Sequence, residues 1–239
     1  MILPMRELGK SIWVHEDEMQ LIGMRMDLRM TIVRLEDGGL WVYSPTNFSP
    51  ELQSKVDALG PVKHLLAPSN GHNMWLEQWQ KAYPEAQVWV SAGIPKKLPK
   101  LQNYRILGDA NDEQAPPPWS EDFDHAFMAG VPFFCENVFL HRASASLLVC
   151  DLVQNHRDVQ QKGVGKFLSK AIFEPLGFKD ICMAPPLKLG FVVKDKVKLQ
   201  DFLRKIAGWE FERIIVAHGT IIEEKPRELF QGLAQRFLG

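Results

Sequence analysis

The sequence lacks several features that would point directly to a class of protein. Its 239 residues contain only three cysteines and no C-x-x-C pair, so neither a disulfide framework nor a cysteine-based zinc site is expected. No apolar run approaches the roughly 20 residues that cross a bilayer, and the N-terminal segment becomes charged too early for a signal peptide. We therefore expect a protein of the reducing cytoplasm that binds no membrane.

The chain also lacks an excess of charge of either sign. It has 28 Lys and Arg against 29 Asp and Glu, a net charge of −1, which gives no overall field to attract nucleic acid. The most basic run, KDKVKLQDFLRK, is typical of the solvated face of a helix. The expected partner is a small-molecule substrate or ligand, with no nucleic acid, and the oligomeric state is left open.

Common catalytic motifs are missing as well. The sequence contains no G-x-S-x-G elbow around a serine nucleophile. It has no G-x-x-x-x-G-K loop for phosphate and no G-x-G-x-x-G after a strand. Serine catalysis and nucleotide binding are therefore not favoured.

What is present is a series of short strand-like runs with few helices. Predicted strands are SIWVHE, MRMTIVRL, LWVYSP, VKHLLAP, QVWVSA, FDHAFMAG, NVFLHR, SLLVCDL and RIIVAH. Helices are expected after Ser49, over HNMWLEQWQKAYP, VGKFLSKAIFEPLG and KVKLQDFLRKIAG, and from Pro226. The prolines between Gly93 and Trp119 predict an irregular surface crossing. This order predicts an α/β protein with two sheets covered by helices, formed as a single domain over residues 1–239.

Three of these segments deliver a polar side chain at or just after the end of an apolar strand. They are His72 in VKHLLAPSNGHNMW, Asp151 in ASLLVCDLVQN and His218 in ERIIVAHGTI. Buried strands leave their ends as the place for chemistry, and imidazole and carboxylate together suit one divalent ion of zinc, iron or manganese. Taken singly, each residue is as readily explained as a cap or a turn former.

Other polar residues are weaker candidates. His141, at the end of a predicted strand, and Asn155, in the loop after Asp151, are candidate substrate-binding residues. Asn73, beside His72, is a third. The remaining histidines are expected to face solvent: His15, His64, His125 and His156.

The motifs LLVCDL, IIVAHG and LLAPSNGHNMW, with the phrases HLLAPSNGH and VFLHR, resemble the metallo-β-lactamase superfamily. The resemblance is closer to an uncharacterised branch, a domain of unknown function, and spans nearly the whole chain. It implies a four-layer αββα sandwich with a metal site at one edge of the two sheets. It also implies that Asp151 and His218 occupy ligand positions.

The chain departs from the superfamily at its histidines. The H-x-H-x-D-H motif is represented only by His72, with Ser69, Asn70 and Asn73 as weak oxygen donors. The segment AGVPFFCEN contains no histidine where another ligand would fall. The first hypothesis is a hydrolase of an ester, thioester, lactone or phosphoester that uses one ion. The second is a metal-free, inactive member that binds a small molecule or a partner.

Overall fold

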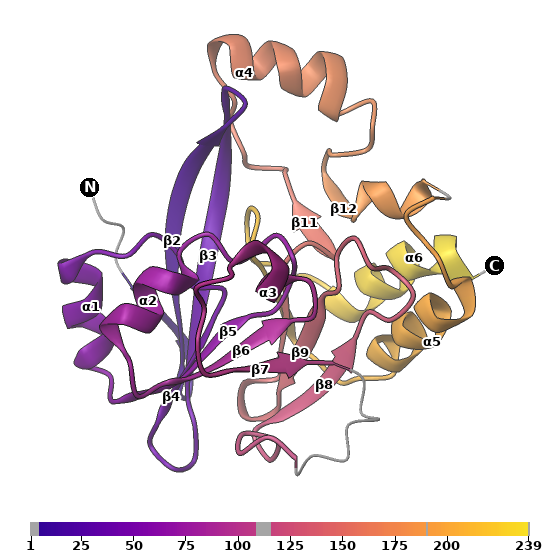
Figure 1. Cartoon of the computed structure of the whole chain (residues 1–239). Helices are drawn as coiled ribbons and strands as arrows, with labels where there is room; N and C mark the ends of the chain where they lie inside the picture. Colours follow the sequence, from indigo (N-terminus) through magenta and orange to yellow (C-terminus); the bar gives the residue numbers. More distant parts are fainter. Residues whose placement is uncertain (1–4, 109–115, 190, 239) are drawn as a thin grey trace.

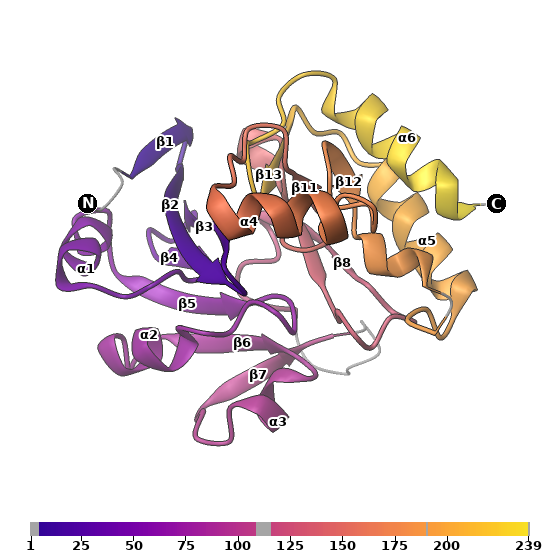
Figure 2. The ribbon, with the colours of Figure 1, turned by 90° about the horizontal axis from the view of Figure 1, so that it is seen from above.

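Two β-sheets face each other, and helices cover the outer face of each sheet (Figures 1 and 2). The structure is a computed structural model and describes residues 5–108, 116–189 and 191–238. The layers run helix, sheet, sheet, helix, so the predicted four-layer αββα sandwich is confirmed.

The first sheet has seven strands in chain order: β1 Arg6–Gly9, β2 Ile12–Leu21, β3 Met24–Arg34, β4 Leu40–Tyr43, β5 Val62–Ala67, β6 Gln87–Ser91 and β7 Tyr104–Leu107. Strands β1 to β4 are antiparallel, and β4 to β7 are parallel. Strands β2 and β3 are the longest and extend past their neighbours as an arm (Figure 1).

The second sheet has the order β13-β10-β9-β8, with bounds β8 Phe123–Phe127, β9 Asn137–His141, β10 Ser146–Val149 and β13 Arg213–Val216. Strands β8 to β10 form the predicted meander, and β13 joins β10 in parallel. A separate antiparallel pair, β11 Val153–Asn155 and β12 Ile181–Met183, follows Asp151.

The helices are α1 Pro50–Asp57, α2 Leu76–Ala82, α3 Ile94–Lys97, α4 Gly163–Leu168, α5 Lys196–Ala207 and α6 Pro226–Leu238. A π-helical turn, Ser169–Phe173, continues α4, and two 3₁₀ turns are formed by Arg142–Ser144 and Pro185–Lys188. The predicted cap of α1 is confirmed, since Ser49 Oγ accepts a hydrogen bond from Leu52 N at 3.1 Å.

Aromatic side chains fill the space between the two sheets. Trp41 lies at the centre, with ring centroids 4.3 Å from Phe123 and 5.1 Å from Phe139. Tyr43 and Trp119 also contact Trp41, and all five side chains are almost fully buried. Burial of several large rings is a major stabilising contribution. It fixes the two sheets relative to each other, and therefore also the strand ends that carry the candidate site.

Some local predictions were wrong. The segment expected to be irregular contains α3 and β7, because Pro95 occupies the first turn of a helix, where no hydrogen bond is lost; residues 109–115 of that segment lie outside the described residues. Trp75 precedes α2 instead of belonging to it. Within the described residues, no helix has the length and apolar character needed to cross a bilayer.

The histidines predicted to face solvent are mostly buried. His15 and His64 are 3% and 7% exposed, and His125 and His156 are half-buried. Burial lowers the pKa of His64 to about 4, and its Nδ1 accepts a hydrogen bond from Trp89 Nε1 at 3.2 Å. The strand that carries His64 lies between β4 and β6, so a position near the start of the strand does not expose it.

The low pKa of His64 predicts a pH-dependent stability difference. The unfolded chain takes up a proton near pH 6.5, whereas folded His64 does so only near pH 4. The wild type should therefore lose stability relative to His64→Gln as the pH falls from 6.5 to 4, by up to about 1.4 kcal/mol per pH unit. Urea unfolding at several pH values measures this difference. A difference that does not change with pH would contradict the assignment.

Candidate metal site

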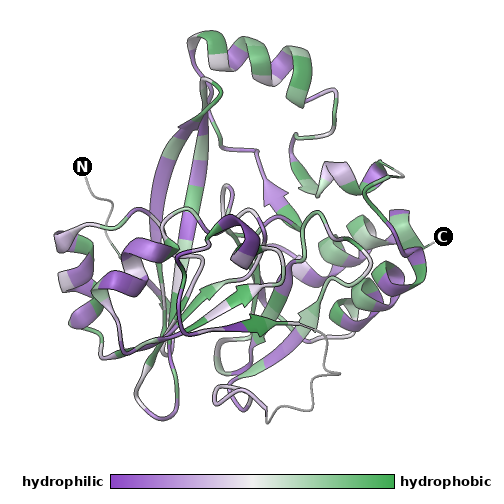
Figure 3. Ribbon diagram, viewed as in Figure 1, coloured by the Kyte–Doolittle hydropathy of each residue, from purple (hydrophilic) through white to green (hydrophobic). Residues whose placement is uncertain are grey.

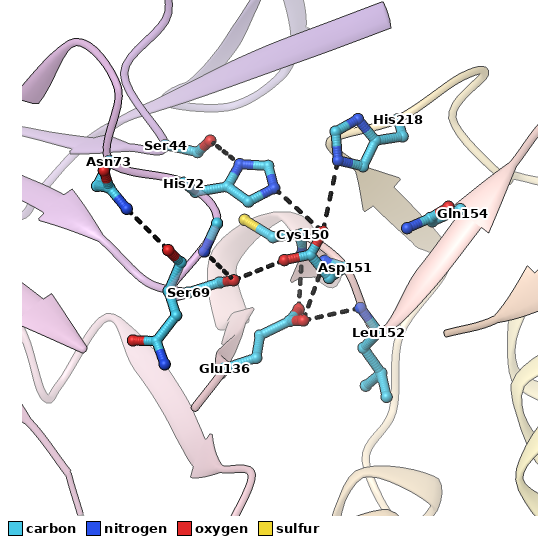
Figure 4. Close-up of polar contacts among 12 residues, drawn as sticks. Ser44, Ser69, His72, Asn73, Glu136, Cys150, Asp151, Leu152, Gln154 and His218 are labelled. Atoms are coloured by element: carbon cyan, nitrogen blue, oxygen red, sulfur yellow. Dashed lines mark hydrogen bonds and ion pairs between the residues drawn. The ribbon is translucent and has the colours of Figure 1, made fainter. Parts of the chain in front are cut away.

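The three predicted ligand residues come together at the carboxyl-terminal edge of the two sheets (Figure 4). His72 lies in the loop after β5, Asp151 follows β10, and His218 follows β13. One potential ligand atom from each residue lies within 4.8 Å of the other two. Since β10 and β13 are parallel neighbours, their carboxyl ends necessarily bring Asp151 and His218 to the same place.

Both imidazoles face the same oxygen of Asp151. The distance from His72 Nε2 to Asp151 Oδ1 is 3.5 Å, and that from His218 Nε2 is 3.6 Å. Ligand atoms held at about 2.0–2.2 Å around a tetrahedral ion lie roughly 3.3–3.6 Å apart. These spacings and the donor set of two nitrogens and one oxygen fit one divalent ion.

The other ring nitrogen of each imidazole, Nδ1, makes a hydrogen bond on the side that faces away from Asp151. His218 Nδ1 lies 2.9 Å from the carbonyl oxygen of Asp27, and His72 Nδ1 lies 2.7 Å from Ser44 Oγ. A carbonyl only accepts, so Nδ1 of His218 carries the hydrogen, and in the neutral ring Nε2 keeps its lone pair towards Asp151. Outer hydrogen bonds of this kind orient metal-binding histidines.

The electrostatics of the cluster favour an ionised Asp151. Burial opposes the charge, but the imidazoles of His72 and His218 hold the pKa of Asp151 well below its usual range. Burial would lower the pKa of His218, yet the Asp151 carboxylate raises it. Without an ion, Asp151 and His218 therefore stabilise each other's charged form.

A fully buried carboxylate holds the Asp151 turn from behind. Glu136, directly before β9, accepts hydrogen bonds from three successive backbone N–H groups, those of Cys150, Asp151 and Leu152, at 2.7, 3.0 and 2.7 Å. Burial and the nearby Asp151 charge raise the pKa of Glu136 to about 8, while the three N–H groups act in the opposite direction. Glu136 thus sets the position of the turn that presents Asp151.

Ser69 supports the side chain of Asp151 directly. Its buried hydroxyl donates to Asp151 Oδ2 at 2.6 Å and accepts from Gly71 N at 3.2 Å. Ser69 is therefore a hydrogen-bond partner of the candidate ligand Asp151. Asn73 donates from Nδ2 to the carbonyl of Asn70 at 2.8 Å and lines the cavity beside the site.

The other two candidate substrate-binding residues lie elsewhere. His141 pairs with Ser146 at the start of β10, the end opposite Asp151, and its Nδ1 lies 2.7 Å from Ser144 Oγ. Antiparallel pairing of β9 with β10 places it away from the site. The amide of Asn155 is used at both ends, donating to Thr220 O and accepting from Arg157 N. Neither residue lines the cavity at the site.

Asn155 has a structural role instead, together with the glycine after His218. Its backbone N–H donates to the carbonyl of His218 at 3.0 Å. Gly219 has φ +89°, and a Cβ there would overlap the Asn155 carbonyl oxygen. The close approach of these two backbones explains why glycine follows His218.

A cavity of about 500 Å³ opens beside the three ligand residues. Among its polar lining residues are Gln154 and His156, whose side chains bond each other at 2.9 Å. His156 was expected at the surface, but it is half-buried directly after β11, and burial lowers its pKa to about 4. No motif in the sequence indicated Gln154, His156 or Glu136.

Comparison with known proteins agrees with this architecture. The sequence model of a family described as "Domain of unknown function (DUF4336)" matches residues 9–163. The chain belongs to this family. No curated protein matches its sequence.

Solved structures of the metallo-β-lactamase superfamily share the fold of this family member. A metallo-β-lactamase from Pontibacter korlensis is 13% identical with a TM-score of 0.59, over 97% of this chain and 98% of that chain. A putative diflavin flavoprotein fragment from Nostoc sp. PCC 7120 is 11% identical with a TM-score of 0.65, over 98% and 94%. A metal-soaked Flv1 flavodiiron core from Synechocystis sp. PCC6803 is 10% identical with a TM-score of 0.65, over 98% and 60%.

The departures from the superfamily motifs now have a structural counterpart. The segment without the expected histidine, AGVPFFCEN, contributes Glu136, which holds the Asp151 turn. The segment around His72, which stands where the superfamily has H-x-H-x-D-H, contributes Ser69, whose hydroxyl donates to the Asp151 carboxylate. Both segments support Asp151 in this family member.

The hydrogen bonds of Glu136 predict a specific loss on substitution. In Glu136→Gln the amide NH₂ would face one of the three N–H donors, which leaves a buried donor unpaired. The free energy of unfolding should fall by about 1–3 kcal/mol, as measured by urea denaturation. Glu212→Gln, at an exposed position, is the matched control and should be nearly neutral. Equal stability of the two variants would argue against the role of Glu136.

Proposed function

We propose that the protein is a hydrolase that uses one divalent ion, zinc, iron or manganese, held by His72, Asp151 and His218. The substrate would be an ester, thioester, lactone or phosphoester. The observation that carries the proposal is the orientation of the two histidines: both Nε2 atoms face Asp151 Oδ1, and both Nδ1 atoms are bonded outward.

The number of ligands supports one ion. Among residues 5–108, 116–189 and 191–238, a single cluster of three metal-type ligands is found. Three protein ligands leave a position for water or substrate, the arrangement of catalytic mononuclear sites. The chemistry that such an ion supplies is polarisation of an acyl or phosphoryl centre and acidification of water.

The protein's own residues would hold and shield the reacting groups. Ser69 and Glu136 keep Asp151 in place, while Ser44 and the Asp27 carbonyl keep the imidazole rings oriented. Gln154 and Asn73 offer amide groups at the cavity wall. These amides are the candidates for binding the polar part of a substrate.

The similar structures do not choose between reaction types, because some are titled metallo-β-lactamases and others a diflavin flavoprotein and a flavodiiron core. We favour hydrolysis because three ligands suffice for one Lewis-acidic ion, whereas a two-metal centre needs more.

The alternative is a metal-free member that binds a small molecule or a partner. One observation favours it: Asp151 already has partners in Ser69 and the two imidazoles, so the cluster is electrostatically complete without a cation. The two proposals differ in whether the cluster takes up metal.

Metal uptake is the direct test. Protein purified without chelator, or reconstituted with Zn²⁺, should contain close to one ion per chain. His218→Ala should weaken binding by more than about 100-fold, because it removes a ligand and not merely an outer partner. His64→Gln, a histidine variant in β5 away from the cluster, should bind as the wild type does. Uptake is measured by elemental analysis and competitive titration.

Activity is measured in a second experiment on the same protein. A panel of esters, thioesters, lactones and phosphoesters should show turnover that chelator removes and the added ion restores. If neither purified nor reconstituted protein takes up metal, the hydrolase proposal falls and the metal-free alternative remains.

A further inference from the structure

The cavity beside the metal site is walled by an arm that no other strand covers in the part of the chain that the structure describes. β1 pairs with β2 only as far as Val14, and β4 pairs with β3 only from Thr31, so the two arm strands pair only with each other between these points. A two-stranded ribbon alone is marginally stable in water. It therefore needs contacts elsewhere.

Helix α4 and the loop before it provide those contacts at the tip of the arm (Figure 1). The side-chain amide of Gln161 accepts from Arg25 N at 2.9 Å and donates to Arg25 O at 2.6 Å, as a neighbouring strand would. Gly165 lies so close that an added Cβ would be 2.6 Å from the carbonyl of Gly23. The arm and α4 together form an arch over the metal site.

The two faces of the arm differ in chemistry. Met19 is paired with Met26 and Leu21 with Met24, and these side chains line the cavity. The other face carries the pairs Glu18–Asp27 and Gln20–Arg25, of which Asp27 and Arg25 also line part of the cavity. Figure 3 shows the resulting alternation of apolar and polar residues along the strands. An apolar face that stays uncovered promotes aggregation, and exposed apolar surface of this kind often marks a binding site.

The rest of the cavity wall combines aromatic rings with polar side chains such as Gln154 and Asn73. Trp75 and Phe173 contribute rings from the loop before α2 and the π-helical turn after α4, and the three metal-type ligands lie at one end. The volume of about 500 Å³ is within the range of about 300–1,000 Å³ for small-molecule sites. Methionine is the most adaptable apolar side chain, so a methionine ladder suits a flexible ligand better than a rigid one.

We propose that this cavity binds an unbranched alkyl or acyl chain, which lies along Met19, Met24 and Met26 and presents a carbonyl or carboxylate head to His72, Asp151 and His218. The position of the head rests on the proposed metal-dependent function, whereas the chain site does not. The natural substrate would then be a fatty acyl ester, thioester or lactone, and not a small polar ester.

The chain site is tested with straight-chain carboxylates from hexanoate to tetradecanoate, by calorimetric titration of zinc-loaded and of chelator-treated protein. Each added CH₂ should lower the dissociation constant about fourfold until the cavity is filled. This dependence should appear in both forms, with tighter binding overall when zinc is present. A dissociation constant independent of chain length in both forms would overturn the proposal.

Substitutions locate the chain. Met19→Gln/Met26→Gln should weaken tetradecanoate binding at least about tenfold by making the ladder polar. Glu18→Gln, on the opposite face of the same strand, should leave it unchanged. Met74 is exposed and lies on another wall of the cavity, so Met74→Gln tests the chain site without changing the arm. It should weaken tetradecanoate binding several-fold, and it keeps the test valid if the double variant does not fold. Wild-type affinity in folded Met19→Gln/Met26→Gln and Met74→Gln would overturn the assignment.

The two proposals fail in different ways. If the protein takes up no metal but the dependence on chain length persists, the hydrolase proposal falls and the chain site stands. If metal binds in the ratio of one ion per chain but affinity does not depend on chain length, the chain site falls and the hydrolase proposal stands.

Discussion

The site depends on one buried carboxylate, Glu136, and the three N–H groups that it binds. A turn after a buried strand would otherwise leave these donors without partners in a dry environment, at a cost of about 1–3 kcal/mol each. Glu136 satisfies all three at once and thereby fixes the direction in which Asp151 leaves β10. The burial of one carboxyl group is thus the condition for presenting another in a defined place.

The remaining supports come from separate parts of the fold, and each restrains one ligand. The hydroxyl of Ser69 holds the second oxygen of Asp151, and the Asp27 carbonyl holds His218. Asp27 belongs to the arm, and buried Arg29 on the same strand donates to the carbonyl of Val216 in β13. The arm therefore forms one wall of the cavity and also orients His218. Binding of a ligand along the arm and the orientation of His218 are for this reason physically connected.

The sequence was sufficient for the layers and for bringing His72, Asp151 and His218 together at one edge, for one reason. Apolar strands that end in His or Asp must release those side chains at the sheet edge, and parallel strands share that edge. It was not sufficient for Glu136, whose partners lie 14 to 16 residues further along the chain. Asn155 was a candidate because it closely follows Asp151 in sequence, and His141 because it ends a predicted strand. Antiparallel pairing places His141 at the opposite end of β10 from Asp151, and the Asn155–Gly219 bridge directs Asn155 elsewhere.

The solved structures of the superfamily share the sandwich with this chain but few of its side chains. Identities of 10–13% with TM-scores of 0.59–0.65 mean that the sandwich persists while nearly every side chain differs. Asp151 and His218 follow strands of the second sheet, so the sandwich itself positions them. His72 lies on a loop, and loops accept change more readily than strands do. The sandwich therefore constrains the placement of Asp151 and His218 more strongly than that of His72.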